Sequence, residues 1–228
     1  MNFIKTFAFL GASLLSANTV FANGVSLGAT RVVYPINSKQ VSLPLINHSQ
    51  KDRYLVNAWI ENNNEKRSQD FLMTPPIFVS EANTENTFRI IKAVENLPTD
   101  RESVYWINVK TIPSIDKEVL ENSNVLQLAV LSRIKLFVRP NSLPYTSEEA
   151  VKHIKFYNND QGVVIENSSP YHVSFVNMEL DGEKIQNKMA KPFAATQLHN
   201  QQGQALSFQT VNDYGGLTKR VEYNIGSK

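Results

Sequence analysis

The residues able to do chemistry in this chain are few, and their spacing fits no familiar catalytic or metal-binding pattern. The four histidines, His48, His153, His172 and His199, lie far apart, and none forms a His-x-x-x-His pair. The absence of cysteine excludes disulfides, thiolate metal sites and a cysteine nucleophile. Neither a glycine-rich phosphate loop nor a Gly-x-Ser-x-Gly turn occurs. We therefore expect no enzymatic activity, no metal and no cofactor.

Composition indicates a folded protein with one or two domains. The chain has 228 residues, of which 42% are hydrophobic, 19% charged and 10% aromatic, enough apolar material for a buried core. The formal net charge of +2 is too small to draw the protein towards nucleic acid, so no nucleic-acid partner is expected.

The first 22 residues have the pattern of a cleavable secretory signal peptide. Lys5 supplies the positive charge, the apolar run Phe7 to Leu15 follows, and Val20-Phe21-Ala22 suits a cleavage site. The apolar run is shorter than the ~20 residues that span a bilayer, so we expect export without membrane insertion. Export of a cysteine-free chain fits a bacterial periplasm best. Two Asn-x-Ser triplets, at Asn47 and Asn167, match the glycosylation pattern but are common by chance.

Alternation of apolar and polar residues predicts strands over most of the mature chain. Val41 to Leu45 alternates but contains Pro44, which is typical of a strand near a sheet edge. Two segments, Tyr54 to Ile60 and Val104 to Val109, are apolar on both parities and predict central strands with Trp59 and Trp106 in the core. Further strands are expected around Phe88 and Ile90 and over residues 163–165, 171–180, 206–208 and 221–225.

These short strands, with turn residues between them, predict an all-β protein built of two β-sandwiches. The apolar phase slips within Tyr171 to Leu180, which indicates a β-bulge. Helical periodicity is absent apart from one possible turn in Ser114 to Glu121. The proline-containing stretch after Arg139 is the best linker, which gives domains over residues 23–140 and 146–228 joined by residues 141–145.

The segment Val125 to Val138 is unusual because it reads as one long apolar strand, VLQLAVLSRIKLFV. Leu126, Leu128, Val130 and Ile134 share one parity. Such a strand is either buried in the centre of a sheet or, where part of it lies at an edge, a template for another chain. The pattern alone leaves both possibilities open.

Several longer motifs resemble the periplasmic chaperones of the chaperone–usher pathway, which assembles pili (fimbriae). They are Gly24 to Pro35, Thr74 to Phe78, Asp100 to Ser103, Tyr105 to Lys110, Ile112-Pro113, Ser132 to Pro140 and Asn212 to Thr218. Together they cover essentially the whole mature chain. The separation of strands by only Ser114 to Asn124, and the lack of cysteine, resemble the short-loop branch of this family.

The resemblance implies two immunoglobulin-like domains arranged as a boomerang around an inter-domain cleft. It also implies an ATP-independent function, in which the chaperone lends a strand to incomplete pilus subunits and delivers them to an outer-membrane usher. Subunits, adhesin and usher are then the expected partners, with self-association possible when the chaperone is free. By motif position, Leu126, Leu128 and Val130 are the donated side chains, with Ile134 a further candidate on the same parity.

Five further residues take roles from the same resemblance. Arg31 and Lys135 match two cleft cations that grip the terminal carboxylate of the subunit. Lys135 lies on the opposite parity to Leu126 and Leu128, and the sequence does not decide which face of the strand it occupies. The others match a buried ionic link between the domains, formed by Glu102, Arg139 and Asp213.

The sequence leaves two alternatives. One is a pilus structural subunit, although pilins usually carry an N-terminal donor extension and a cysteine pair. The other is a different exported immunoglobulin-like binding protein.

Overall fold

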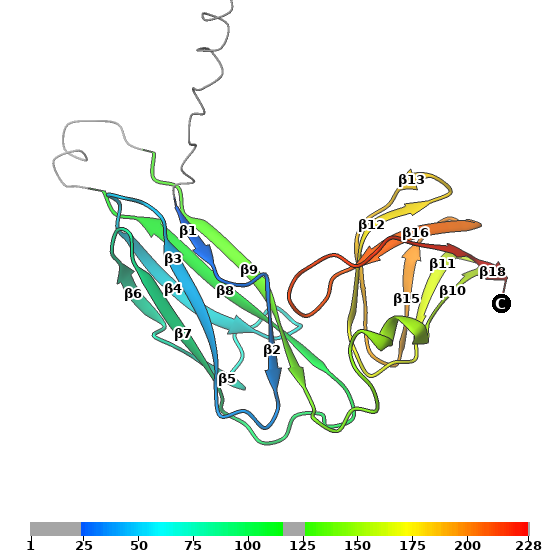
Figure 1. Cartoon of the computed structure of the whole chain (residues 1–228), viewed down its shortest axis with the longest axis horizontal. Coiled ribbons are helices and arrows are strands. Elements are labelled where there is room, and N and C mark those ends of the chain that lie inside the picture. The colour runs from blue at the N-terminus through cyan, green and yellow to red at the C-terminus, as the bar shows by residue number, and fades with distance from the viewer. Residues whose placement is uncertain (1–23, 116–125, 228) are drawn as a thin grey trace, which may run out of the picture.

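The computed structural model describes residues 24–115 and 126–227 and consists almost entirely of strands. The expected signal peptide and most of the segment Ser114 to Asn124, including the possible helical turn, lie outside the described residues. Two β-sandwiches meet at an angle in a boomerang shape (Figure 1), as expected from the resemblance. Within the described residues, no helix is long and apolar enough to cross a membrane.

The first sandwich packs a four-stranded sheet against a five-stranded sheet. The four-stranded sheet has the order β1 (Val25–Leu27), β3 (Val41–Asn47), β7 (Glu85–Lys92), β5 (Phe71–Thr74). The five-stranded sheet has the order β2 (Arg31–Pro35), β9 (Val130–Arg139), β8 (Ser103–Pro113), β4 (Tyr54–Glu61), β6 (Ile77–Ser80). Alternate residues of both sheets fill the core between them, among them Tyr34, Leu43, Phe88, Ile107 and Leu136.

The prediction that Val41 to Leu45 lies near a sheet edge is confirmed, because β3 is the second strand of its sheet and the edge strand β1 pairs only with Leu45 to Asn47. Pro44 is tolerated because β1 ends at Leu27, where the chain crosses to the other sheet and continues as β2. Gly28 begins this crossing, and its N–H donates to the Pro44 carbonyl at 2.9 Å. A Cβ at Gly28 would lie 3.0 Å from Pro44 Cβ, so the close approach favours glycine.

The second sandwich also consists of two sheets. One has the order β15 (Ala194–His199), β11 (Gly162–Asn167), β10 (Ile154–Asn159), β18 (Gly226–Ser227). The other has the order β13 (Glu183–Lys184), β12 (Val173–Leu180), β16 (Ala205–Thr210), β17 (Val221–Asn224), with β14 (Lys188–Ala190) also paired to β12. A short 3₁₀ helix, Glu149–His153, precedes β10. Aromatic rings of Phe156, Phe175 and Phe208 form the centre of this core.

The β-bulge predicted in Tyr171 to Leu180 is confirmed. The register between β12 and β16 shifts between Val176 and Glu179, and Asn177 within this interval has a φ of 50°. The shift carries the buried side of the strand from Phe175 to Met178, which explains the slip in apolar phase.

The prediction that both tryptophans belong to the core is wrong. Trp59 and Trp106 are only half-buried and lie on the outer face of the five-stranded sheet, where each ring packs against an arginine. Their neighbours Ala58, Ile60 and Ile107 point inwards and fill the core instead. Apolar residues on both parities of these strands therefore serve two faces of the sheet. The inward residues fill the core, and the tryptophans on the outer face pack against arginines.

The two Asn-x-Ser triplets have the same structural role in the two sandwiches. Asn47 ends β3, and its side-chain amide donates to the carbonyls of Asp52 and Glu81 at 2.9 and 2.8 Å while its Oδ1 accepts from Ser49 N–H. Asn167 ends β11 with an equivalent set of bonds to the backbone. Both side chains are buried, so they fasten loops rather than present a modification site.

Replacing Asn47 with alanine is expected to lower the free energy of unfolding by about 2–4 kcal/mol, because several buried backbone groups lose their partners. Urea denaturation followed by circular dichroism measures this change. The exposed Asn63→Ala serves as the matched control and should stay within about 0.5 kcal/mol of the wild type. Equal stability of the two variants would contradict the role of Asn47.

Candidate functional site

The candidate site centres on β9, whose two halves are paired differently. Along its whole length β9 pairs with β8, from Val130 opposite Thr111 to Val138 opposite Ser103. On its other side, β2 pairs only with the second half, from Lys135 to Arg139. Within the described part of the chain, Val130 to Ile134 therefore have a strand partner on one side only.

The expected strand over Val125 to Val138 is too long by several residues. Strand β9 begins at Val130, and residues 126–129 precede it without forming a ladder. The reason lies in β8, where Pro113 follows two residues after Thr111 and has no N–H to extend the pairing. The side chain of Gln127 reaches the Pro113 carbonyl instead, at 2.8 Å.

Three of the four predicted donor side chains are open to solvent. Leu126 is 81% exposed, Leu128 65% and Val130 59%, which is unusual for large apolar residues in one short segment. Ile134 does not share this exposure, because it packs partly against the core of its own sandwich. The segment that leads into β9 therefore carries apolar side chains that the sandwich does not cover.

Arg31 and Lys135 lie side by side on the opposite face of the sheet. They are directly paired across β2 and β9, and both point towards the second sandwich. Arg31 Nη1 donates to the Val211 carbonyl at 3.0 Å, and Lys135 Nζ lies 3.3 Å from Ser174 Oγ. The cations therefore face the cleft between the sandwiches, while Val130, which has the opposite parity to Lys135 within β9, lies on the other face.

This pair of cations is partly buried and has no carboxylate in direct contact within the described residues. Burial lowers the pKa of Arg31 below its ordinary value, although the charges of Asp213 and Glu102 oppose the shift, and burial together with the charge of Arg31 lowers the pKa of Lys135. Within the described residues neither forms an ion pair with a carboxylate, and the buried Arg31 Nε has no hydrogen-bond partner. An anion placed between them would relieve both the repulsion and the desolvation.

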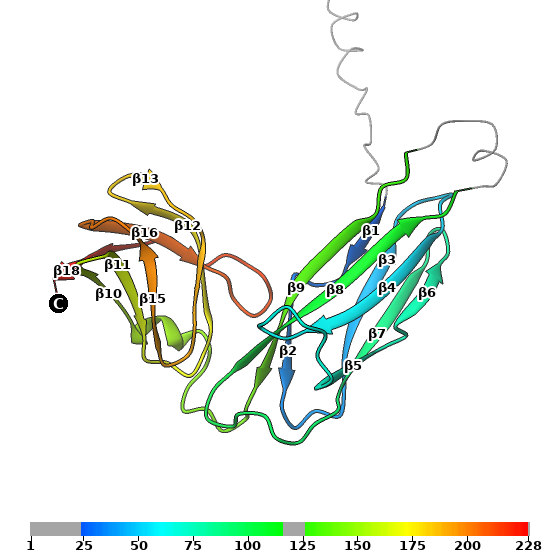
Figure 2. The ribbon, with the colours of Figure 1, turned by 180° about the vertical axis from the view of Figure 1, so that it is seen from behind.

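The segment between β16 and β17 reaches from the second sandwich to β2 and β9, as both ribbon views show (Figures 1 and 2). It brings the Val211 carbonyl to Arg31 and Asp213 to Arg139. At its tip Gly215 has a φ of +84°, and a Cβ there would lie 2.1 Å from Thr30 Oγ1. Glycine is favoured here, because another residue would be strained by the positive φ and would require the Thr30 side chain to move.

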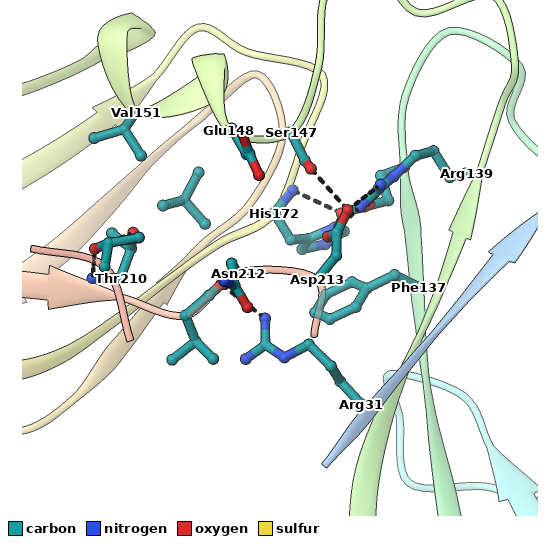
Figure 3. Close-up of a pocket in the computed structure, with 14 residues that line it drawn as sticks. Arg31, Phe137, Arg139, Ser147, Glu148, Val151, His172, Thr210, Asn212 and Asp213 are labelled. Carbon is teal, nitrogen blue, oxygen red and sulfur yellow. Dashed lines mark hydrogen bonds and ion pairs between the residues drawn. The ribbon is translucent and has the colours of Figure 1, made fainter. Parts of the chain in front are cut away.

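Arg139 and Asp213 meet at the junction of the two sandwiches (Figure 3), and Glu102 also contacts Arg139 there. Arg139 Nη1 and Nη2 donate to Asp213 at 2.6 and 2.8 Å, and Arg139 Nε donates to Glu102 Oε1 at 2.9 Å. Burial opposes the charge of Arg139, yet its bonds and charge interactions with both carboxylates raise its pKa. Two groups of the second sandwich complete the network, since the His172 backbone N–H donates to Glu102 and Ser147 Oγ donates to Asp213.

A cavity of about 220 Å³ lies beside this network, between the two sandwiches (Figure 3). Arg31 and Phe137 of the first sandwich line one side, and Val151, Val173 and Val211 of the second line the other. Because of this cavity, the space beside the Arg31 side chain between the sandwiches is not filled by other side chains.

Sequence reasoning missed several members of this site. His172 and Ser147 contact the ionic network, and Ser174 contacts Lys135, but isolated serines and histidines in strand sequences carry no distinguishing signal. Thr30 and Gly215 belong to the quoted motifs, yet their contact depends on the three-dimensional arrangement of the domains.

Two sandwiches bridged by an ionic network, with a half-paired apolar strand at the rim, define a binding protein of the assembly-chaperone class. Family models match both halves of the chain. Residues 24–144 match the N-terminal domain of PapD, described as a pili and flagellar-assembly chaperone, and residues 149–222 match the C-terminal domain of the pili assembly chaperone PapD.

Individual relatives agree with the family models. A protein of Escherichia coli K12 named "Probable fimbrial chaperone SfmC" is 45% identical over 214 residues, which cover 93% of each chain. Chaperone protein FimC of Escherichia coli O6:H1 is 38% identical, covering 95% of this chain and 92% of its own. The crystal structure of the periplasmic chaperone SfaE aligns with a TM-score of 0.78 and 38% identity, covering 90% of this chain and 100% of SfaE. The SafB chaperone of Salmonella enterica, solved in complex with the SafA pilin, is 25% identical with a TM-score of 0.80, over 90% and 97% of the two chains. The chain belongs to the family of pilus (fimbrial) assembly chaperones.

The ionic network predicts that stability depends on pH in the acid range. Burial by itself raises the pKa of Asp213, but the hydrogen bonds and charge of Arg139 outweigh it and hold that pKa below the ordinary value. A lowered folded pKa contributes stability that is full above the unfolded pKa of about 4 and is lost as the pH falls through the folded value. The melting temperature of wild type should therefore exceed that of Asp213→Asn at pH 7, with the difference shrinking at pH 3.

Thermal unfolding at pH 7, 5 and 3 measures this difference. The exposed Asp160→Asn, in the same sandwich, should track the wild type throughout. A gap between wild type and Asp213→Asn that is the same size at pH 7 and at pH 3 would count against the charge-based role of Asp213.

Proposed function

We propose that this protein binds pilus subunits by lending them the first half of β9 as a temporary strand, and that it delivers them to an outer-membrane usher. The observation that carries the proposal is the free edge of β9 from Val130 to Ile134, beside exposed apolar side chains. Unpaired backbone groups on a strand edge bind another strand through main-chain hydrogen bonds. The complex of the SafB chaperone with the SafA pilin supports this choice of partner.

The donated side chains supply the affinity in this proposal. Leu126, Leu128 and Val130 are exposed, and in an extended strand paired with the guest they would share one face and fill alternate positions of an apolar groove. Burial at about 1.5–3 kcal/mol for each side chain gives a gross gain of roughly 5–9 kcal/mol, from which ordering and association costs are subtracted. Ile134 contributes less, because it is already packed against its own domain. Strand pairing provides the driving force, so ATP is not required.

The cation pair fixes the register of the guest strand. Because β2 begins at Arg31, opposite Lys135, a strand added along the free edge of β9 must stop beside these two residues. A chain terminus fits this position, and its carboxylate would accept charge-assisted hydrogen bonds from both cations. We therefore infer that Arg31 and Lys135 bind the terminal carboxylate of the subunit.

The network of Glu102, Arg139 and Asp213 keeps the two sandwiches at a fixed angle in this proposal. A buried ionic network adds little net stability, because desolvation of the charges offsets their attraction. Its directional bonds nevertheless restrict rotation between residues 23–140 and 146–228, our proposed domains, about the linker at residues 141–145. A fixed angle would keep Arg31 and Lys135 at the end of the guest strand.

We further propose that the protein works in the periplasm after removal of residues 1–22. The family of fimbrial chaperones is periplasmic, and the crystal structure of SfaE is that of a periplasmic chaperone. Adhesin subunits are proposed clients together with structural pilins. When no client is bound, the exposed apolar segment of β9 offers a surface for self-association.

Replacement of Leu128 with aspartate tests the lent strand. The variant should remain folded, because Leu128 is largely exposed, but it should recover at least tenfold less subunit, since a charge would enter an apolar groove. Subunits that co-purify with the tagged chaperone from periplasm are identified by mass spectrometry and quantified. Leu72→Asp, at a comparably exposed leucine on β5, is the matched control and should recover subunits normally. Equal recovery by the two variants would contradict donation by β9.

Arg31→Ala and Lys135→Ala test the carboxylate grip separately. Each variant should keep the melting temperature of the wild type within a few degrees yet lose subunit recovery, because one cation alone holds the terminus weakly. Arg53→Ala, which removes an exposed arginine of the first sandwich outside the cleft, should leave recovery unchanged. Normal subunit complexes in both cleft variants would rule out this grip.

A further inference from the structure

One row of side chains crosses the cleft-facing side of the five-stranded sheet. Glu61 of β4 is paired with Trp106 of β8, Trp106 with Lys135 of β9, and Lys135 with Arg31 of β2. Directly opposite residues on one face of a sheet lie close enough for their side chains to interact. The indole of Trp106 therefore stands between a carboxylate and the two cleft cations.

Trp106 contacts two cations that differ in their other partners. The guanidinium carbon of Arg133 lies 4.5 Å from the centre of the indole, and Lys135 Nζ lies 5.7 Å from it. Arg133 also forms ion pairs with Glu61 and Glu65, at 3.4 and 3.1 Å. Lys135 has no such partner within the described residues, and its polar contact is Ser174 Oγ.

We propose that Trp106 is a positioning residue for the Lys135 ammonium, which it holds beside Arg31 while no anion is present. The negative face of an indole attracts a cation most strongly where water is partly excluded, and Lys135 is half-buried. This attraction compensates for the repulsion by Arg31 that would otherwise turn the flexible lysine towards solvent. The cation pair is thus already in place when a carboxylate arrives, which reduces the ordering required on binding.

Arg133 supports the orientation of the Trp106 indole. Because Glu61 and Glu65 fix its guanidinium, Arg133 stacks on the indole without competing for the incoming anion. The inference rests on the proposed function for its benefit to binding, but the contact between Trp106 and Lys135 can be tested in the free protein.

The first test is nuclear magnetic resonance of the free protein with labelled lysine. The Lys135 ε-methylene signals, assigned from their loss in Lys135→Arg, should be shifted upfield by the indole ring current. Trp106→Leu should return them to ordinary lysine positions, and Trp106→Phe should preserve part of the shift. Trp59→Leu is the matched control, since that ring lies over Arg67 at 5.3 Å. Unshifted Lys135 signals in the wild type would overturn the proposal without reference to any variant.

The second test measures retention of the co-purified subunit as the salt concentration is raised. Trp106→Leu should bind roughly three- to tenfold more weakly than the wild type, with partial rescue by Trp106→Phe and no change in Trp59→Leu. Wild-type retention by Trp106→Leu, together with loss in Lys135→Ala, would overturn the positioning role. If Arg31→Ala and Lys135→Ala both retain subunits, the carboxylate grip fails, while the ring-current shift still decides whether Trp106 holds Lys135.

Discussion

The structure depends on the incomplete pairing of one strand. Backbone N–H and C=O groups at a sheet edge favour pairing with another strand, and proteins usually cover or interrupt such edges. Here β2 pairs with β9 only from Lys135 onwards, because the residues that precede β2 form β1, which belongs to the opposite sheet. The same crossing therefore places Arg31 at the start of β2 and leaves Val130 to Ile134 free on one side. The edge and the charged end of that edge have a single structural cause.

Much of the architecture could be predicted from the sequence, because strand alternation and turn residues are local signals. The bulge in β12 was visible as a slip from Phe175 to Met178 in the apolar phase. The predicted inward orientation of Trp59 and Trp106 was wrong. Hydrophobicity alone does not show that an indole packs against cations on the outer face of a sheet. The position of Pro44 near a sheet edge was also visible in the sequence, and it holds because β1 pairs only with Leu45 to Asn47 before the chain changes sheets.

Some residues of the site could be predicted from the sequence, and others depend on contacts with distant parts of the chain. The longer motifs identified Arg31, Lys135, Glu102, Arg139 and Asp213, and the structure brings these residues to one junction. Sequence parity alone could not place Lys135, because the facing domain is needed to define the cleft side of β9. The start of β9 at Val130 was missed because the limit is set by Pro113 on another strand. Residues such as His172 and Ser174 gain their significance only from distant partners.

The contact between Gly215 and Thr30 has a mechanical consequence for the molecule as a whole. Hydrogen bonds from Arg139 to Asp213 resist separation of the two lobes, whereas the touching backbone and hydroxyl resist their further approach. The hinge is thus bounded in both directions by a few atoms, and its inward stop is the smallest residue available. A methyl group at that stop would overlap the Thr30 hydroxyl, so the junction could accept it only if Thr30 rotated or the lobes shifted.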